Sequence, residues 1–197
     1  MFEFSDQFFW YATRSAGLLL WAASAASVIV GLLMPTRLLG RRPTIPWLLD
    51  LHRYLGSLTV VLLVIHVVTL RLDPFVAFTW RDVLVPGAAQ VSGLSGLSLA
   101  YGVVAGWIIV VVQLTSVIKD QMPESLWHSV HMLSLAALGT GTIHAVDVGS
   151  DTDNVVALAA AVSLGITTIV LLGFRISRYL EDRRIRYEAF LAEIDEF

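Results

Sequence analysis

Two pairs of histidines lie inside apolar stretches of this chain. His52 and His66 are separated by thirteen residues, and His131 and His144 are separated by twelve. An ionisable ring inside an apolar segment costs free energy unless it has a partner, so histidines within membrane spans are candidates for function. Two pairs on two segments fit two haem groups stacked across a bilayer, with each iron held between helices. The pattern therefore predicts a path for electrons through a membrane.

The composition places the chain in the membrane class. Hydrophobic residues make up 56% of its 197 residues and the mean hydropathy is +0.74, which is too apolar for a soluble domain with a solvated surface. The chain has no cysteine, so disulfides, iron–sulfur clusters and thiolate chemistry are excluded and histidine becomes the main metal-binding side chain. We expect a multi-pass protein of the plasma membrane with lipid around it and no nucleic-acid partner.

Five stretches are long and apolar enough to cross a membrane, because a hydrocarbon core of about 30 Å needs about 20 mostly apolar residues per helix. They cover residues 9–34, 46–70, 94–118, 123–146 and 155–174. We therefore expect an all-α membrane protein, in which a bundle of five transmembrane helices encloses two stacked b haems. This domain is expected over residues 1–176, followed by a cytoplasmic amphipathic tail over 177–197. The connection 71–93 is expected to include a short interfacial helix.

The positions of Lys and Arg predict the direction of these spans, since cytoplasmic connections carry more of both. If the spans alternate, ten of these residues lie on one side and three, namely Arg14, Arg71 and Arg81, lie on the other. The side with ten is predicted to be cytoplasmic. The N-terminus is then outside and the C-terminus inside, and the second and fourth spans run in the same direction.

This direction gives the histidines two levels. His52 and His131 lie at the inner end, and His66 and His144 lie at the outer end. Fourteen helical steps leave His66 within about 40° of His52 around the helix axis, but thirteen steps leave His144 about 140° from His131. We therefore predict a kinked or 3₁₀-like stretch near residues 139–142, where glycines alternate with threonines.

The sequence around the histidines resembles the ferric reductase-like transmembrane domain. This domain is shared by ferric reductases, NADPH oxidases and the haem subunit of a periplasmic methionine sulfoxide reductase system. The resemblance covers residues 10–175 and includes LHRYLG at the first pair and QLTSVIKDQMPESLWHSVH before the second. It implies that His52 and His131 ligate the iron of an inner haem b, and that His66 and His144 ligate that of an outer one. Two imidazoles per iron suit the transfer of one electron.

The resemblance also implies partners. The larger oxidases and reductases continue into a region that binds flavin and nicotinamide, and this chain has no G-x-G-x-x-G fingerprint for such a cofactor. We expect an oxidoreductase component without catalytic side chains, reduced by a separate cytoplasmic flavin reductase or by membrane quinol, so that flavin or quinone is shared with a partner. Ferric iron is the first expected acceptor, followed by oxygen or a partner protein. The alternatives are a haem-bearing anchor that exchanges electrons with quinone, and a structural protein without redox chemistry.

Four other features have two interpretations each. Arg14 and Arg53 could pair with haem propionates, or they could extend to lipid headgroups and anchor the topology. His128 could be a further ligand or a solvated interfacial residue. The acidic stretch that begins at Asp147 could attract a cationic acceptor or be a solvated loop. The tail could dock a donor protein or lie on the membrane.

Overall fold

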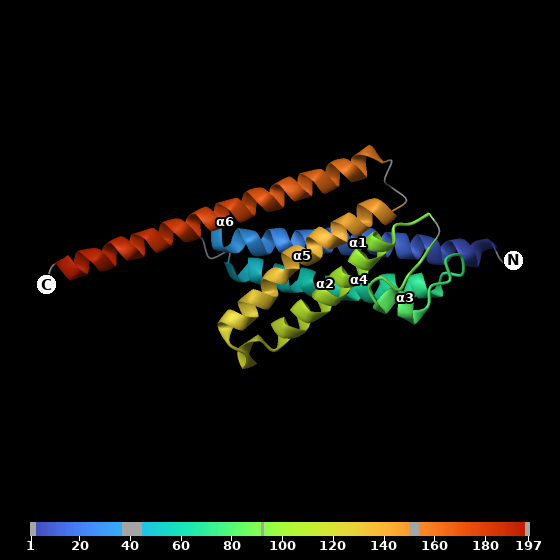
Figure 1. Cartoon of the computed structure of the whole chain (residues 1–197), viewed down its shortest axis with the longest axis horizontal. Coiled ribbons are helices and arrows are strands. Elements are labelled where there is room, and N and C mark those ends of the chain that lie inside the picture. The colour runs from blue at the N-terminus through green and yellow to red at the C-terminus, as the bar shows by residue number, and fades with distance from the viewer. Residues whose placement is uncertain (1–2, 37–44, 92, 150–153, 196–197) are drawn as a thin grey trace.

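The chain folds as a bundle of helices (Figure 1). The computed structural model describes residues 3–36, 45–91, 93–149 and 154–195, and these contain no β-strand. The helices are α1 (Glu3–Thr36), α2 (Ile45–Leu72), α3 (Trp80–Leu84), α4 (Gly96–Val117), a short 3₁₀ helix η1 (Lys119–Gln121), α5 (Glu124–Val148) and α6 (Val155–Asp195). The predicted all-α class is confirmed.

Two antiparallel hairpins make up the body of the bundle. Helix α1 packs along α2, and α4 packs along α5, whereas the contacts between these hairpins are much sparser. The second hairpin crosses the first obliquely (Figure 1). Helix α6 lies along α1, and its C-terminal part extends beyond the other helices, so that the start of α1 and the end of α6 lie at opposite ends of the molecule.

Four helices in the described part of the chain could cross a membrane by their length and composition. These spans are Gln7–Pro35, Pro46–Leu72, Gly96–Val117 and Val155–Glu188. They correspond to four of the five predicted spans, so the multi-pass helical character is confirmed in this form. The fourth predicted span forms α5, a helix of 25 residues, which is not among these four. Its three histidines and two acidic residues lower its mean hydropathy.

Small side chains bring the helices together. Ala16, Ala23 and Ala25 of α1 and Ala137 of α5 are all buried, and residues of this size let the backbones of membrane helices approach closely. Many larger apolar side chains, such as Ile169 on α6, remain exposed. An apolar exterior of this kind is what a helix in contact with lipid tails requires.

The connection between α2 and α4 folds back onto the bundle. Thr79 and Asp82 form a capping box at the start of α3, and Phe78 and Val83 are buried in a small apolar cluster with Leu99 of α4. The predicted short helix is therefore present, and it packs against the ends of α2 and α4.

Helix α5 is an uninterrupted α-helix, and the predicted 3₁₀-like stretch is wrong. The α-helix runs from Glu124 to Val148 and includes both glycines. The hydroxyls of Thr140 and Thr142 donate in addition to the carbonyl oxygens of Ala136 and Leu138 one turn earlier, at 2.8 and 2.7 Å. Because α5 crosses the first hairpin obliquely, the side of α5 that faces that hairpin changes along its length (Figure 1). Two histidines on different sides of the helix can therefore both point inward. Helix α6 is also continuous, and it runs through the predicted boundary at residue 176.

Candidate functional site

The two histidines predicted to lie at the inner level face each other. His52 of α2 and His131 of α5 have ring centroids 5.8 Å apart, with their planes inclined at 68°. The rings come from different hairpins, across a boundary where the backbones make few contacts. Two imidazoles opposed in this way can supply two axial ligands to one iron.

The other two histidines, His66 and His144, which are predicted to form the outer pair, lie on the same two helices, α2 and α5. His52 and His66 are fourteen helical steps apart along α2, which is about 21 Å of helix. One member of each predicted pair thus lies on α2 and the other on α5.

Backbone carbonyls orient three of the four rings. Each Nδ1–H donates, at 2.9 Å, to a carbonyl oxygen of the adjacent helix in the same hairpin: His52 to Ser27, His66 to Thr13, and His144 to Ser98. A carbonyl oxygen only accepts hydrogen bonds, so the proton of each neutral ring is on Nδ1. The lone pair of Nε2 is then available, as in metal sites where the second ring nitrogen is held by the protein.

A glycine makes room for each of these three rings. A Cβ atom at Gly17 would lie 3.0 Å from Cε1 of His66, one at Gly31 would lie 3.2 Å from Cε1 of His52, and one at Gly102 would lie 2.6 Å from Nδ1 of His144. Each glycine follows the accepting carbonyl by four residues, which is one helical turn. We call such a carbonyl and the small residue four positions later a cradle.

The fourth ring is held differently. Nδ1 of His131 lies 3.3 Å from the hydroxyl of Ser116 on α4, instead of contacting a backbone carbonyl. The indole of Trp127 stacks on the same ring, with centroids 5.0 Å apart and planes inclined at 29°. The indole Nε1 of Trp127 is buried and has no hydrogen-bond partner in the described part of the chain.

The ligand set that the described residues offer to a metal consists of histidine rings in pairs. The described residues contain no group of three or more His, Asp or Glu side chains that could hold an ion by themselves. A haem needs only two protein ligands, because the macrocycle supplies the rest. The opposed imidazoles of His52 and His131, between hairpins that touch only sparsely, could supply two such ligands.

The structure gives other predicted residues local partners. Arg14 lies over the ring of Trp10, with 5.1 Å to the centroid, and Arg53 is 3.7 Å from the carboxylate of Asp50 on its own helix. His128 is exposed, and its Nδ1–H donates to the carbonyl of Glu124 within α5 at 3.0 Å.

The acidic stretch after His144 is described only in part. Asp147 accepts a hydrogen bond from the hydroxyl of Ser98, which is the residue whose carbonyl orients His144. Asp151 and Asp153 lie outside the described residues. The one described carboxylate is therefore linked to the outer pair through Ser98.

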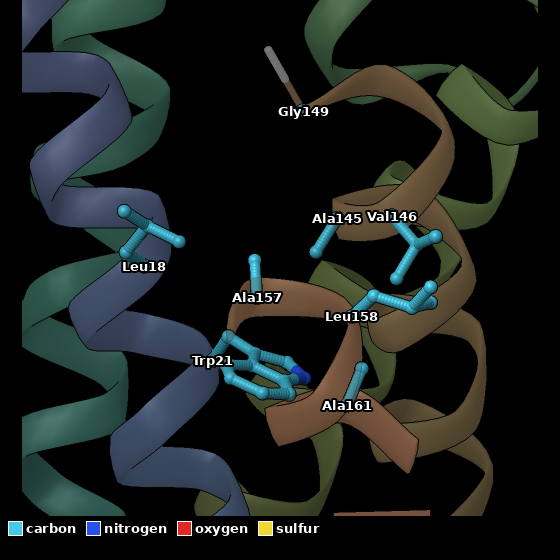
Figure 2. Close-up of a pocket in the computed structure, with 8 residues that line it drawn as sticks. All are labelled: Leu18, Trp21, Ala145, Val146, Gly149, Ala157, Leu158 and Ala161. Carbon is cyan, nitrogen blue, oxygen red and sulfur yellow. The ribbon is translucent and has the colours of Figure 1, made fainter. Parts of the chain in front are cut away.

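A small apolar cavity lies between α1, α5 and α6 (Figure 2). Its volume is about 60 Å³, and its lining includes Leu18, Trp21 and Ala145. The indole N–H of Trp21 donates to the hydroxyl of Thr142 at 3.0 Å. Ligand sites measure about 300–1,000 Å³, so this cavity has the size of a packing gap between three helices.

Sequence reasoning identified the histidines but missed the cradles that hold them. A signal was present, because Gly17 and Gly31 are fourteen residues apart, as are His52 and His66. Reading it requires knowing that α1 and α2 are antiparallel neighbours. Comparison with protein-family models, with curated proteins and with solved structures finds no match to this chain.

Proposed function

We propose that this chain is a di-haem cytochrome b that carries electrons across the plasma membrane, from a cytoplasmic donor to an acceptor outside. The observation that carries the proposal is the pairing of histidines between the hairpins, with His52 facing His131 and with Nδ1 of three rings committed to carbonyl oxygens. The resemblance to the ferric reductase-like transmembrane domain supports the same function.

The four histidines have defined roles in this proposal. His52 and His131 hold the inner haem b, and His66 and His144 hold the outer one. Each haem, when bound, supplies a six-coordinate centre that gains and loses one electron. The chain itself fixes the ring orientations, excludes water with its apolar helices and sets the distance between the levels. Arg14 and Arg53 are proposed to meet haem propionates.

We also propose that α5 is the fifth transmembrane span. Its 25 residues extend over about 37 Å, which exceeds the about 30 Å of a hydrocarbon core. The two chain ends lie at opposite ends of the bundle (Figure 1), as an odd number of crossings requires. Inward-facing histidines on α5 need not contact lipid, which removes the main cost of placing them in a membrane. Lys119 in the connection between α4 and α5, together with the five arginines of the last part of α6, supports a cytoplasmic C-terminus.

The donor is proposed to be a cytoplasmic flavin reductase or membrane quinol, and the acceptor ferric iron, oxygen or a partner protein. Both exchanges suit centres whose axial positions are filled by protein ligands, because such centres pass electrons without binding a substrate at iron. The chain is then an oxidoreductase component and requires no catalytic side chain of its own.

A second function, that of a haem-bearing anchor that exchanges electrons with quinone, is favoured by a hollow on α4 and α5. The hollow is open and measures about 460 Å³; Leu97 and Ile143 give it apolar walls, and Tyr101 and Asp147 add polar groups. A quinone headgroup needs this combination of apolar contact and hydrogen bonds. Ser98 also lines the hollow, next to the outer pair.

A haem count on purified protein tests the first proposal. A pyridine haemochrome assay with a reduced-minus-oxidised spectrum is expected to give two b haems per chain, and one in His52→Ala and in His66→Ala. His128→Ala is the matched control, because this exposed histidine bonds only within its own helix, and it should retain two haems. Protein without haem, or histidine variants that retain both, would refute the ligand assignment.

A further inference from the structure

The cradles of the first hairpin repeat at the same interval as its histidines. The accepting carbonyls of Thr13 and Ser27 are fourteen residues apart, and so are His66 and His52. The two helices are antiparallel, so the same register between α1 and α2 serves both levels. Both rings of α2 can therefore be held by a carbonyl and a glycine in the same way.

The second hairpin cannot repeat this arrangement. Its outer cradle consists of the Ser98 carbonyl and Gly102, and the equivalent positions fourteen residues later are Val112 and Ser116. His131 and His144, however, are only thirteen residues apart. One residue amounts to about 1.5 Å along the helix and about 100° around it. The ring of His131 is therefore out of register with the carbonyl that should accept its hydrogen bond.

Ser116 occupies the position that corresponds to the glycine of the other cradles, and its hydroxyl lies between the Val112 carbonyl and His131. Its hydroxyl donates to the carbonyl oxygen of Val112 at 2.7 Å. That bond uses its one hydrogen, so the oxygen can only accept from Nδ1–H of His131, which is 3.3 Å away. The order is imidazole N–H to hydroxyl oxygen, then hydroxyl O–H to carbonyl oxygen.

We infer that Ser116 is a positioning residue, whose hydroxyl extends the Val112 carbonyl to His131 and so corrects the one-residue difference between the two hairpins. This inference rests on the proposed function, since it concerns how the inner haem is held. It gives His131 the same protonation state as the other three rings, with the proton on Nδ1 and the Nε2 lone pair directed to the iron.

The hydroxyl should also influence the reduction potential at the inner level. A hydrogen bond from Nδ1–H makes the imidazole a stronger donor to iron, and a stronger donor favours the ferric form. Removing the acceptor weakens His131 as a ligand, so the potential of the inner haem should rise. The two histidines proposed for the outer haem, His66 and His144, both donate to backbone carbonyls, so the potential of that haem should not change.

The experiment compares Ser116→Ala with Ser116→Thr and with Ser129→Ala in the purified full-length protein. Ser129 is the matched control, because it lies on α5 near His131 and its hydroxyl donates to a carbonyl one turn earlier, at 2.9 Å, without contacting a histidine. Potentiometric titration, low-temperature EPR of the low-spin ferric signals and a haem count are measured on each variant. We expect Ser116→Ala to raise one midpoint potential and shift one EPR signal, or to lose one haem. Ser116→Thr and Ser129→Ala should resemble the parent.

The results separate failure of this inference from failure of the proposed function. If the parent binds two haems and Ser116→Ala leaves both potentials and both EPR signals as they are in Ser129→Ala, the inference is overturned and the function stands. If Ser116→Thr shows the same change as Ser116→Ala, the hydroxyl is not responsible and the inference is likewise overturned. If the parent binds no haem, the proposed function fails first.

Discussion

Gly102 and His144 approach each other so closely that a Cβ atom at residue 102 would lie 2.6 Å from Nδ1 of the ring. The histidine is fixed from the same helix, because its Nδ1–H donates to the carbonyl of Ser98 at 2.9 Å. Any side chain at residue 102 must therefore displace the ring or separate α4 from α5. The outer pair depends on a residue that carries no functional group.

Gly102→Ala is thus expected to remove the outer haem while the inner one remains. The pyridine haemochrome count should fall from two to one, and one of two EPR signals should disappear. Gly139→Ala is the control, because a Cβ there meets nothing within 4 Å and alanine favours the helix. Two haems retained in Gly102→Ala would show that the ring does not occupy this position in the membrane.

The glycines of α1 should show a graded version of the same effect. A Cβ would lie 3.0 Å from the ring of His66 at Gly17 and 3.2 Å from that of His52 at Gly31, so a shift of a few tenths of an ångström relieves either contact. We expect both alanine variants to bind haem with lower occupancy than the parent and higher occupancy than Gly102→Ala. Haem-to-protein ratios at equal expression measure this order, and a reversed order would contradict the cradle geometry.

The number of spans can be read from three single-cysteine variants, since the parent has no cysteine. Five spans place Gln90→Cys and Asn154→Cys outside and Asp120→Cys inside. A membrane-impermeant maleimide should then label residues 90 and 154 in intact cells and residue 120 only after permeabilisation. If α5 does not cross, residues 120 and 154 will share one side and label together.

Quinone exchange at the hollow on α4 and α5 would depend on Tyr101. Tyr101→Phe removes its hydroxyl without emptying the apolar lining, so quinol-driven haem reduction should slow while reduction by dithionite is unchanged. Tyr179→Phe, an exposed position on α6, is the control. Equal quinol rates in both variants would argue against this hollow as the exchange site and leave the flavin reductase as donor.

The capping box of α3 should make this segment sensitive to acid. Hydrogen bonds from the Thr79 hydroxyl and backbone hold the pKa of the Asp82 carboxyl below its ordinary value. A group whose pKa is lower in the folded state stabilises that state above the unfolded pKa, which is about 3.9 for Asp, and this contribution disappears as the pH falls through the folded pKa. Amide hydrogen exchange at Val83 should therefore be faster near pH 3 than near pH 6, after correction for intrinsic rates. Asp82→Asn should remove the difference, and an unchanged difference would mean that another group is responsible.

Much of the architecture could be predicted because it depends on local composition. The stretch predicted over residues 46–70 became α2 (Ile45–Leu72), since a long apolar run in a membrane has few alternatives to a helix. The capped α3 was harder, because the burial of Phe78 and Val83 depends on Leu99, which is distant in sequence. Such contacts produce no periodic pattern of apolar residues within the segment itself.

The error at α5 has a geometric cause. An angle of about 140° between His131 and His144 prevents both rings from facing the first hairpin only if α5 runs parallel to it. Because the hairpins cross obliquely, a regular α5 can direct both rings inward without a kink. The crossing angle between the hairpins cannot be predicted from the sequence pattern, because it depends on how small residues such as Ala16 and Ala137 pack.

The division into two hairpins sets an order of biogenesis. His52 and His66 are oriented by α1 alone, so the first hairpin can leave the translocon with both rings already directed. Each pair is completed only by a histidine of α5, which is synthesised later. On the proposed function, each haem could bind only after α5 has been synthesised, and it would then join two hairpins that otherwise make few contacts.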